Sequence, residues 1–202
     1  MPTAADFRPS MRLSAFYAAI FLVTGIQLPF WPVWLSSRGL TARDIGLLLA
    51  AAIWGKVLAA PAIRAIADRT RHRHLLMAAL AGAAIAAYAG LLPASSWWLL
   101  ILLNLVALTA QSALMPLGDA VTLAAVRSQG LDYGRIRLWG SVSFIVASIA
   151  SGAALASSSG NAVLPLVLVA SMLVLLACLG VPQIGPMRSS ERAAGCGPWR
   201  ET

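Results

Sequence analysis

Long apolar segments separated by short polar connections make up most of the 202-residue chain. Each segment is close to the length of about 20 helical residues that crosses a hydrocarbon core of about 30 Å. Backbone groups in lipid must bond within the segment or barrel, and runs this rich in Ala and Leu favour helices over barrel strands. The pattern predicts an all-α polytopic membrane protein with six transmembrane helices, expected approximately at 13–35, 45–63, 75–92, 97–121, 139–155 and 162–181.

Composition supports a membrane protein. Hydrophobic residues make up 59% of the chain and charged residues only 11%, whereas soluble domains average about 45–50% and about 25%. These values exclude a disordered chain and an ordinary soluble enzyme. The two cysteines, Cys178 and Cys196, have no disulfide or metal-site spacing and are expected to be free thiols.

The net charge of +8 comes from basic residues that lie between the apolar segments. They concentrate in alternate connections, and the positive-inside rule therefore predicts that both termini are cytoplasmic. The charge orients the protein in a lipid bilayer, which excludes nucleic acid as the expected partner. We expect residues 1–182 to form the transmembrane bundle and residues 183–202 to form a disordered cytoplasmic tail.

Two prolines suggest an internal repeat. Pro29 and Pro116 lie at similar distances along the first and the fourth segment. Sets of three helices have opposite topology, so the pattern predicts two inverted three-helix repeats whose first helices are interrupted. Interrupted helices at matching places point to a transporter's binding region. The alternative is two unrelated prolines in a membrane protein that tolerates them.

Two ionisable residues lie inside apolar segments, where charge is costly to place. Lys56 precedes Arg64 by eight residues, and Asp119 precedes Arg127 by eight. Eight residues span about 12 Å of helix, which puts both charges at similar depth and allows them to pair. Asp119 is therefore a candidate for reversible protonation, balanced by Lys56. The alternative is a permanent ion pair that holds two helices together.

Polar side chains follow one face of the fourth segment. Asn104, Gln111 and Asp119 share an arc of about 80° at 100° per residue. Gln27 lies in a similar polar arc on the first segment. Such stripes face a bundle interior or a wet cavity, so Gln27, Asn104 and Gln111 are candidates for lining a pathway. The alternative is that they form packing hydrogen bonds between helices.

No catalytic grouping is apparent. His72 and His74 lie among arginines, which indicates a solvated basic turn. The Gly140–Ser141 pair has no histidine within an apolar segment to act as its base. A glycine-rich phosphate loop is also missing. We therefore expect neither an enzyme nor a metal or other cofactor.

One stretch resembles a known motif. Residues 67–74 are similar to the loop between helices 2 and 3 of the major facilitator superfamily, Gly-x-x-x-Asp-Arg-x-Gly-Arg-Arg. Asp68 and Arg69 match its acidic and first basic positions, whereas Arg64 and Arg71 replace its glycines. The resemblance implies that Asp68 and Arg69 form a cytoplasmic gate.

A sharper resemblance comes from two further stretches. They read Leu-Pro-Phe-Trp-Pro-Val-Trp-Leu at 28–35 and Tyr-Gly-Arg-Ile-Arg-Leu-Trp-Gly-Ser at 133–141. Both look like the 3-phenylpropionate transporter-like branch of the superfamily, related to nucleoside and lactose proton symporters. The similarity spans about residues 13–182. It implies proton-coupled secondary transport of a small organic solute, with an aromatic acid as the candidate, in the cell inner membrane.

The basic stretch before the fifth segment has two interpretations. Residues 133–139 are expected to form a loop in which Arg135 and Arg137 anchor to headgroups and to the negative ends of neighbouring helices. The alternative is a gating ion pair with Asp68 or Asp132. This alternative adds both arginines to the cytoplasmic gate.

Members of the superfamily have twelve helices in two halves, with the solute site between them. This sequence resembles the amino-terminal half alone. One interpretation is a truncated gene product that does not transport or that assembles with another chain. The other is a half-transporter that forms a parallel homodimer with its site on the two-fold axis.

Overall fold

The computed structural model describes residues 4–70, 73–156 and 160–181, and this part of the chain contains helices and no strand. Each long helix is apolar enough to cross a membrane, so the prediction of six transmembrane helices is confirmed. The expected tail, 183–202, lies outside the described residues. The helices are α1 (Ala4–Ser37), α2 (Ala42–Arg69), α3 (Arg73–Gly90), α4 (Trp97–Gln129), α5 (Tyr133–Ala156) and α6 (Val163–Gly180), the last preceded by the 3-10 turn η1 (Gly160–Ala162).

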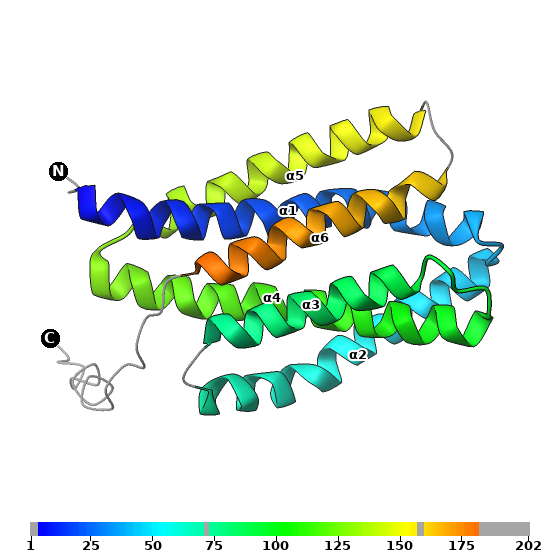
Figure 1. Cartoon of the computed structure of the whole chain (residues 1–202), viewed down its shortest axis with the longest axis horizontal. Coiled ribbons are helices and arrows are strands. Elements are labelled where there is room, and N and C mark those ends of the chain that lie inside the picture. The colour runs from blue at the N-terminus through cyan, green and yellow to red at the C-terminus, as the bar shows by residue number, and fades with distance from the viewer. Residues whose placement is uncertain (1–3, 71–72, 157–159, 182–202) are drawn as a thin grey trace, which may run out of the picture.

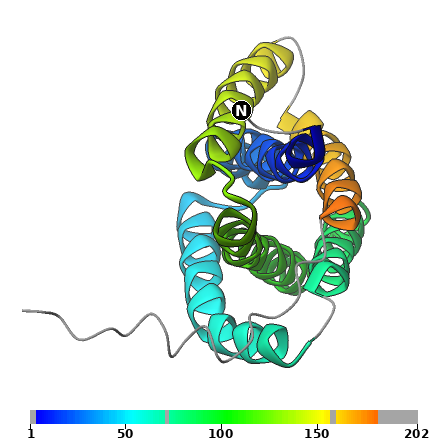
Figure 2. The same ribbon diagram turned by 90° about the vertical axis from the view of Figure 1, so that its left-hand side faces the viewer.

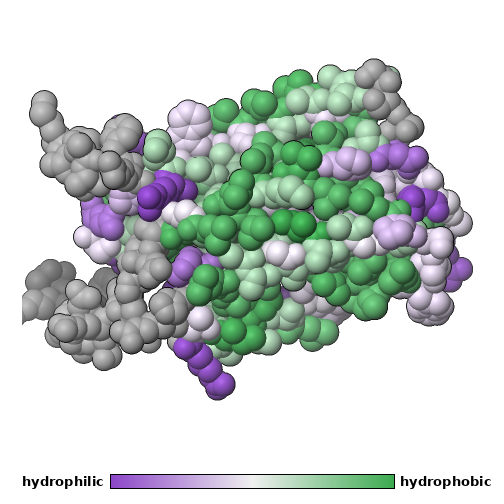
Figure 3. Space-filling view, viewed as in Figure 1, coloured by the Kyte–Doolittle hydropathy of each residue, from purple (hydrophilic) through white to green (hydrophobic). Residues whose placement is uncertain are grey.

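The helices form one elongated bundle (Figure 1), and hydrophobic residues cover most of the middle of the face that Figure 3 shows. The α2–α3 and α4–α5 connections lie at the same end as the start of α1. We call this the basic end because most of the arginines fall there by sequence. Its assignment to the cytoplasm stays a prediction.

Several helices are longer than the apolar runs that predicted them. α4 continues to Gln129 rather than 121, and α5 begins at Tyr133. The expected loop at 133–139 is therefore wrong, because these residues form the first turns of α5. Hydropathy marks only the residues in the hydrocarbon core, and a helix can continue through the interface where polar side chains meet water.

The expected interruptions at the two prolines are also wrong. α1 passes through Pro29 and α4 passes through Pro116 as continuous helices. A proline removes one backbone donor, and neighbouring helices and local adjustments let membrane helices tolerate this. The matching positions of the two prolines therefore do not mark breaks.

The packing of the helices confirms the inverted repeat. α1 packs against α5 and α6, and α4 packs against α2 and α3. In the repeat, α1, α2 and α3 are equivalent to α4, α5 and α6. Exchanging equivalent helices converts the contacts of α1 with α5 and α6 into those of α4 with α2 and α3. Two further pairs, α1 with α4 and α3 with α6, map onto themselves. Figure 2 shows this arrangement along the bundle from the basic end.

Small residues let α1 approach its neighbours closely. A Cβ atom on Gly118 of α4 would fall on the ring of Phe16, and one on Gly140 of α5 would lie 2.8 Å from the ring of Phe21. The Ser143 hydroxyl of α5 donates to the Ala18 carbonyl at 2.7 Å. Without a hydrophobic force between helices in lipid, such close packing and interhelical hydrogen bonds hold α1 in place.

Arg38 fastens the end of the bundle opposite the basic end. Its guanidinium donates to the backbone carbonyls of Leu91, Leu92 and Ala94 in the α3–α4 connection. It also lies over the Trp34 ring, 5.6 Å from the centroid. The C-terminal end of α1 is therefore attached to the connection between the two repeats.

The contact at Gly118 predicts a sensitive position. Gly118→Ala places a methyl group on the fully buried Phe16 ring, and overpacking of this kind costs about 1–3 kcal/mol. Thermal unfolding in detergent is expected to show a lower midpoint. Gly82→Ala on α3 is the matched control, because its Cβ meets nothing within 4 Å. Equal midpoints for the two variants would contradict the close contact.

Candidate functional site

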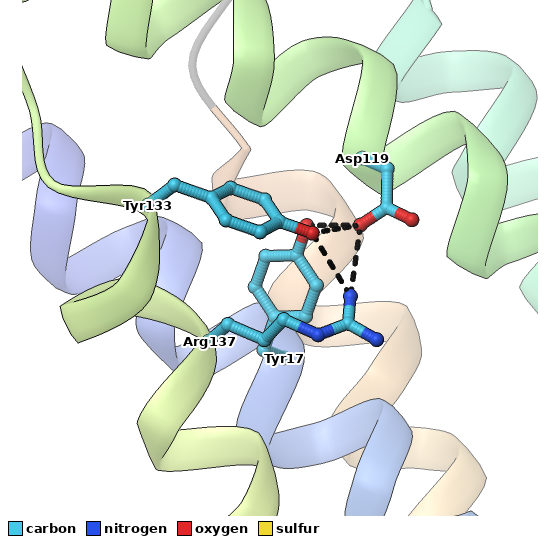
Figure 4. A network of polar contacts seen from close by, with 4 residues as sticks. All are labelled: Tyr17, Asp119, Tyr133 and Arg137. Atoms are coloured by element: carbon cyan, nitrogen blue, oxygen red, sulfur yellow. Dashed lines mark hydrogen bonds and ion pairs between the residues drawn. The ribbon is translucent and has the colours of Figure 1, made fainter.

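A polar network joins three helices inside the basic half of the bundle (Figure 4). The Asp119 Oδ1 atom accepts hydrogen bonds from the hydroxyls of Tyr17 at 2.5 Å and Tyr133 at 3.1 Å. The same oxygen forms an ion pair with Nη1 of Arg137 at 3.3 Å. Arg137 also donates to the Tyr133 hydroxyl at 3.0 Å. We call these four residues the Asp119 network.

Aromatic rings surround the cation of this network. The guanidinium carbon of Arg137 lies 5.8 Å from the Tyr17 centroid, 5.6 Å from that of Phe21 and 5.9 Å from that of Tyr133. Cations within about 6 Å of a ring face are attracted by its quadrupole. The ion pair is therefore held by hydrogen bonds and by ring faces, although 38% of the Arg137 side chain is exposed.

Local backbone features bring the four residues together. α1 and α4 run antiparallel past the Gly118 contact, which places Tyr17 beside Asp119. α4 ends at Gln129 and is capped by Gly130, whose φ of 67° lies in the left-handed region that glycine favours. α5 then begins at Tyr133, so Tyr133 and Arg137 are one turn apart on the same helix face.

The expected pairing of Asp119 with Lys56 is wrong. The cation within ion-pair distance of Asp119 is Arg137 of α5, and no hydrogen bond or ion pair joins Lys56 to another described residue. Similar depth in the membrane does not determine which way two side chains point around their helices. Sequence reasoning missed Arg137 as this partner because it assigned residue 137 to a loop. Extending the fifth helix back to Tyr133 would have brought Arg137 within reach.

Lys56 instead faces a cavity of about 600 Å³ between α2 and α4, which we call the α2–α4 cavity. Asp119 lines the same cavity from α4, and the expected similarity in depth stays a prediction. Lys56 and Arg64 are exposed there, and neither is bonded to another described side chain. The walls also carry small and apolar residues. The lining residues are Lys56, Ala59, Ala60, Ile63, Arg64, Ala67, Arg73, Thr109, Ser112, Ala113, Pro116, Leu117, Asp119, Ala120 and Leu123.

Asp119 therefore belongs both to the Asp119 network, through Oδ1, and to the lining of the α2–α4 cavity. Its hydrogen bonds to described residues all fall on Oδ1, and the second carboxylate oxygen points away from the three donors (Figure 4). The arrangement suits a carboxylate that exchanges a proton or contacts a solute. A metal site is not indicated, because no group of three or more His, Cys, Asp or Glu comes together in the described residues.

The three expected pathway residues do not line the α2–α4 cavity as described. Asn104 is fully buried and accepts from Nε1 of Trp31 at 2.9 Å. Gln27 donates from Nε2 to the Tyr88 hydroxyl at 2.8 Å. Gln111 is 8% exposed, and neither polar atom of its side chain has a partner among the described residues. Two of the three therefore form packing hydrogen bonds, as in the alternative interpretation.

The expected gate residues separate into two groups. Arg135 pairs with Asp132 at 3.5 Å, but both side chains are largely exposed. Arg137 belongs to the Asp119 network, and among the described side chains its ion pair is with Asp119 rather than with Asp132. Arg69 is exposed in the last turn of α2, and the side chain of Asp68 lies outside the part of the chain that is described. The role of these residues in a gate stays a prediction.

Comparison with known proteins identifies the family. The profile of the family described as "MFS_1 like family" matches residues 10–198. The chain belongs to the major facilitator superfamily. With six helices able to span a membrane, this superfamily member is a multi-pass membrane protein. No solved structure gives a significant match.

Two curated relatives support the assignment to the superfamily. The "Probable 3-phenylpropionic acid transporter" of Escherichia coli (strain K12) is 33% identical over 185 residues, which cover 90% of this chain and 48% of the relative. The "Maltose permease" of Geobacillus stearothermophilus is 37% identical over 139 residues, which cover 68% of this chain and 35% of the relative. The chain spans about half the length of the first relative and about a third of the second.

The network predicts energetic coupling between Asp119 and Arg137. A double-mutant cycle with Asp119→Asn and Arg137→Gln is expected to give about 1 kcal/mol, because the pair is only partly buried. Chemical unfolding in detergent measures it. The matched cycle uses Asp132→Asn and Arg135→Gln, an exposed pair expected to show no coupling above error. Equal coupling in both cycles would contradict a special role for the network.

Proposed function

We propose that the chain forms part of a secondary transporter that moves a small organic solute by alternating access, coupled to protons. The α2–α4 cavity carries this proposal. Lys56 and Arg64 line it from α2 and Asp119 lines it from α4, within the membrane-spanning helices or at their edge. Ionisable groups at such depth are costly and mark substrate or proton pathways. The names of both relatives describe solute transport.

We further propose that the solute is an organic acid. One relative is named for an acid and the other for a sugar, and the charges in the cavity favour the acid. Lys56 and Arg64 have no described partner, and the carboxylate of Asp119 already pairs with Arg137. The apolar part of the wall suits an aromatic ring. A volume of about 600 Å³ falls in the range of small-molecule sites.

Asp119 is the proposed proton acceptor. Protonation removes the charge that holds Arg137, which weakens the tie between α4 and α5 and favours rearrangement at the basic end. Lys56 balances the site through the solute: an organic anion neutralises Lys56 while a proton neutralises Asp119. One anion and one proton then cross together without net charge, which is a symport mechanism.

The surroundings of the site follow from the same proposal. The basic end faces the cytoplasm of a cell whose inner membrane holds the protein, and Asp68, Arg69 and Arg135 contribute to the cytoplasmic gate. A second six-helix unit covers the wall that carries Lys56, since a charge there needs protein or water rather than lipid. That unit is a second copy of this chain, a separate chain or the second half of a longer protein.

Asp119→Asn is expected to abolish accumulation of 3-phenylpropionate driven by a proton gradient in liposomes. Asparagine keeps the shape of the side chain but cannot take up the proton. Uptake is measured at several external pH values, and the oligomeric mass of the same sample identifies a second copy. Accumulation by Asp119→Asn with an unchanged pH dependence would remove Asp119 from coupling. A monomer that moves neither solute nor protons would favour the non-transporting alternative.

Lys56→Gln is expected to raise the KM for 3-phenylpropionate about tenfold, equivalent to about 1.4 kcal/mol of lost interaction with the carboxylate. Lys56→Arg keeps the charge and is expected to remain within about threefold of the original KM. Arg43→Gln, at the opposite end of α2, is the matched control and should leave KM unchanged. Equal KM values for Lys56→Gln and Lys56→Arg would exclude a charge contact.

A further inference from the structure

The α2–α4 cavity is closed at one end by a contact between its two helices. A Cβ atom on Gly55 of α2 would lie 2.8 Å from Cδ1 of Leu105 and 2.9 Å from Oγ1 of Thr109 on α4. The lining begins directly beyond this contact, at Lys56 on α2 and Thr109 on α4. From there α2 and α4 diverge toward the basic end (Figures 1 and 2). The cavity therefore has a closed end beside Lys56 and extends toward the basic end.

The α2 wall of the cavity has a cation at each end of an apolar stretch. Its lining residues recur every three or four positions, which places them on one face of the helix. Lys56 and Arg64 are eight residues apart, about 12 Å along α2, and both are exposed. Ala59, Ala60 and Ile63 lie between them. An apolar surface therefore separates two groups that can each bind an anion.

Positive charge predominates in the cavity. The charged lining residues are Lys56, Arg64, Arg73 and Asp119. The carboxylate of Asp119 already pairs with Arg137, which is not part of the lining. Arg64 lies near the end of α2 and Arg73 begins α3, so both arginines of the lining lie toward the basic end. Positive potential in a cleft concentrates anions and speeds their association. An anion arriving from the basic end therefore meets Arg64 before Lys56.

We propose that Arg64 is a second binding residue for the carboxylate of the solute, which it captures at the mouth of the α2–α4 cavity and passes to Lys56 at the closed end. The solute enters carboxylate first, and its apolar body follows along the stretch between the two cations. The solute class is then a monocarboxylate with the acid at one end and an apolar ring or chain at the other. This inference rests on the proposed function for the organic acid and for the second unit that covers the side of the cavity.

Binding kinetics test the two cations separately. The full chain in detergent is mixed in stopped flow with 1-naphthylacetate, an aromatic acid whose fluorescence changes when its ring leaves water. Arg64→Gln is expected to lower the association rate constant about tenfold at low salt and to leave dissociation nearly unchanged, because a charge at the mouth acts on the approaching anion. Lys56→Gln is expected to raise the dissociation rate constant about tenfold, since its contact belongs to the final complex. Added salt should remove most of the effect of Arg64→Gln.

Matched variants show whether the charge and its position matter. Arg64→Lys keeps the charge and is expected to keep the association rate constant within about threefold. Arg127→Gln removes an arginine from the last turn of α4 that does not line the cavity, and it should change neither rate constant. Equal losses with Arg64→Gln and Arg127→Gln would overturn capture at Arg64. An association rate constant that Arg64→Gln leaves unchanged would overturn it as well.

Uptake of 3-phenylpropionate into liposomes by the same variants separates this inference from the proposed function. Association that depends on Arg64 in a chain without uptake would support capture and overturn transport. Uptake together with association that does not depend on Arg64 would overturn capture and leave transport standing. A chain that binds no 1-naphthylacetate would overturn both the capture residue and the proposal of an organic acid.

Discussion

The cost of keeping a carboxylate within a lipid-embedded bundle governs the arrangement around Asp119. Arg137 supplies the opposite charge, two phenols supply hydrogen bonds, and three ring faces surround the cation. Each contribution comes from a helix that must be in a particular place. α1 reaches α4 only because Gly118 leaves room for Phe16, and α5 presents Arg137 only because it begins at Tyr133. The electrostatic contacts of Asp119 therefore depend on how closely α1, α4 and α5 pack.

The fold was predictable because lipid imposes a simple length rule. Apolar runs of about 20 residues located all six helices, and their number gave the inverted repeat. The helix ends were not predictable from hydropathy, since α4 and α5 continue into polar sequence at the basic end. The prolines gave the wrong local structure because α1 and α4 tolerate the loss of a backbone donor.

The residues of the candidate site were predictable from the sequence, but their partners were not. Lys56 and Asp119 do line one cavity, Lys56 from α2 and Asp119 from α4. The partner of Asp119 is nevertheless on α5, because pairing depends on rotation about each helix and on which helices are neighbours. Gln27 and Asn104 have ordinary hydrogen-bond partners, whereas Gln111 does not. A sequence cannot distinguish these amides, since the difference lies in tertiary contacts.

The hydrogen bonds from Arg38 to the α3–α4 connection, which we call the Arg38 clamp, constrain that connection in an unusual way. Its acceptors are backbone carbonyls of Leu91, Leu92 and Ala94, and every amino acid provides such a carbonyl. As far as the clamp is concerned, the side chains of this connection are free to change, but an inserted or deleted residue would move the acceptors away from the guanidinium. Arg38 therefore restricts the length of the connection rather than its composition, and substitutions should be tolerated there more readily than insertions.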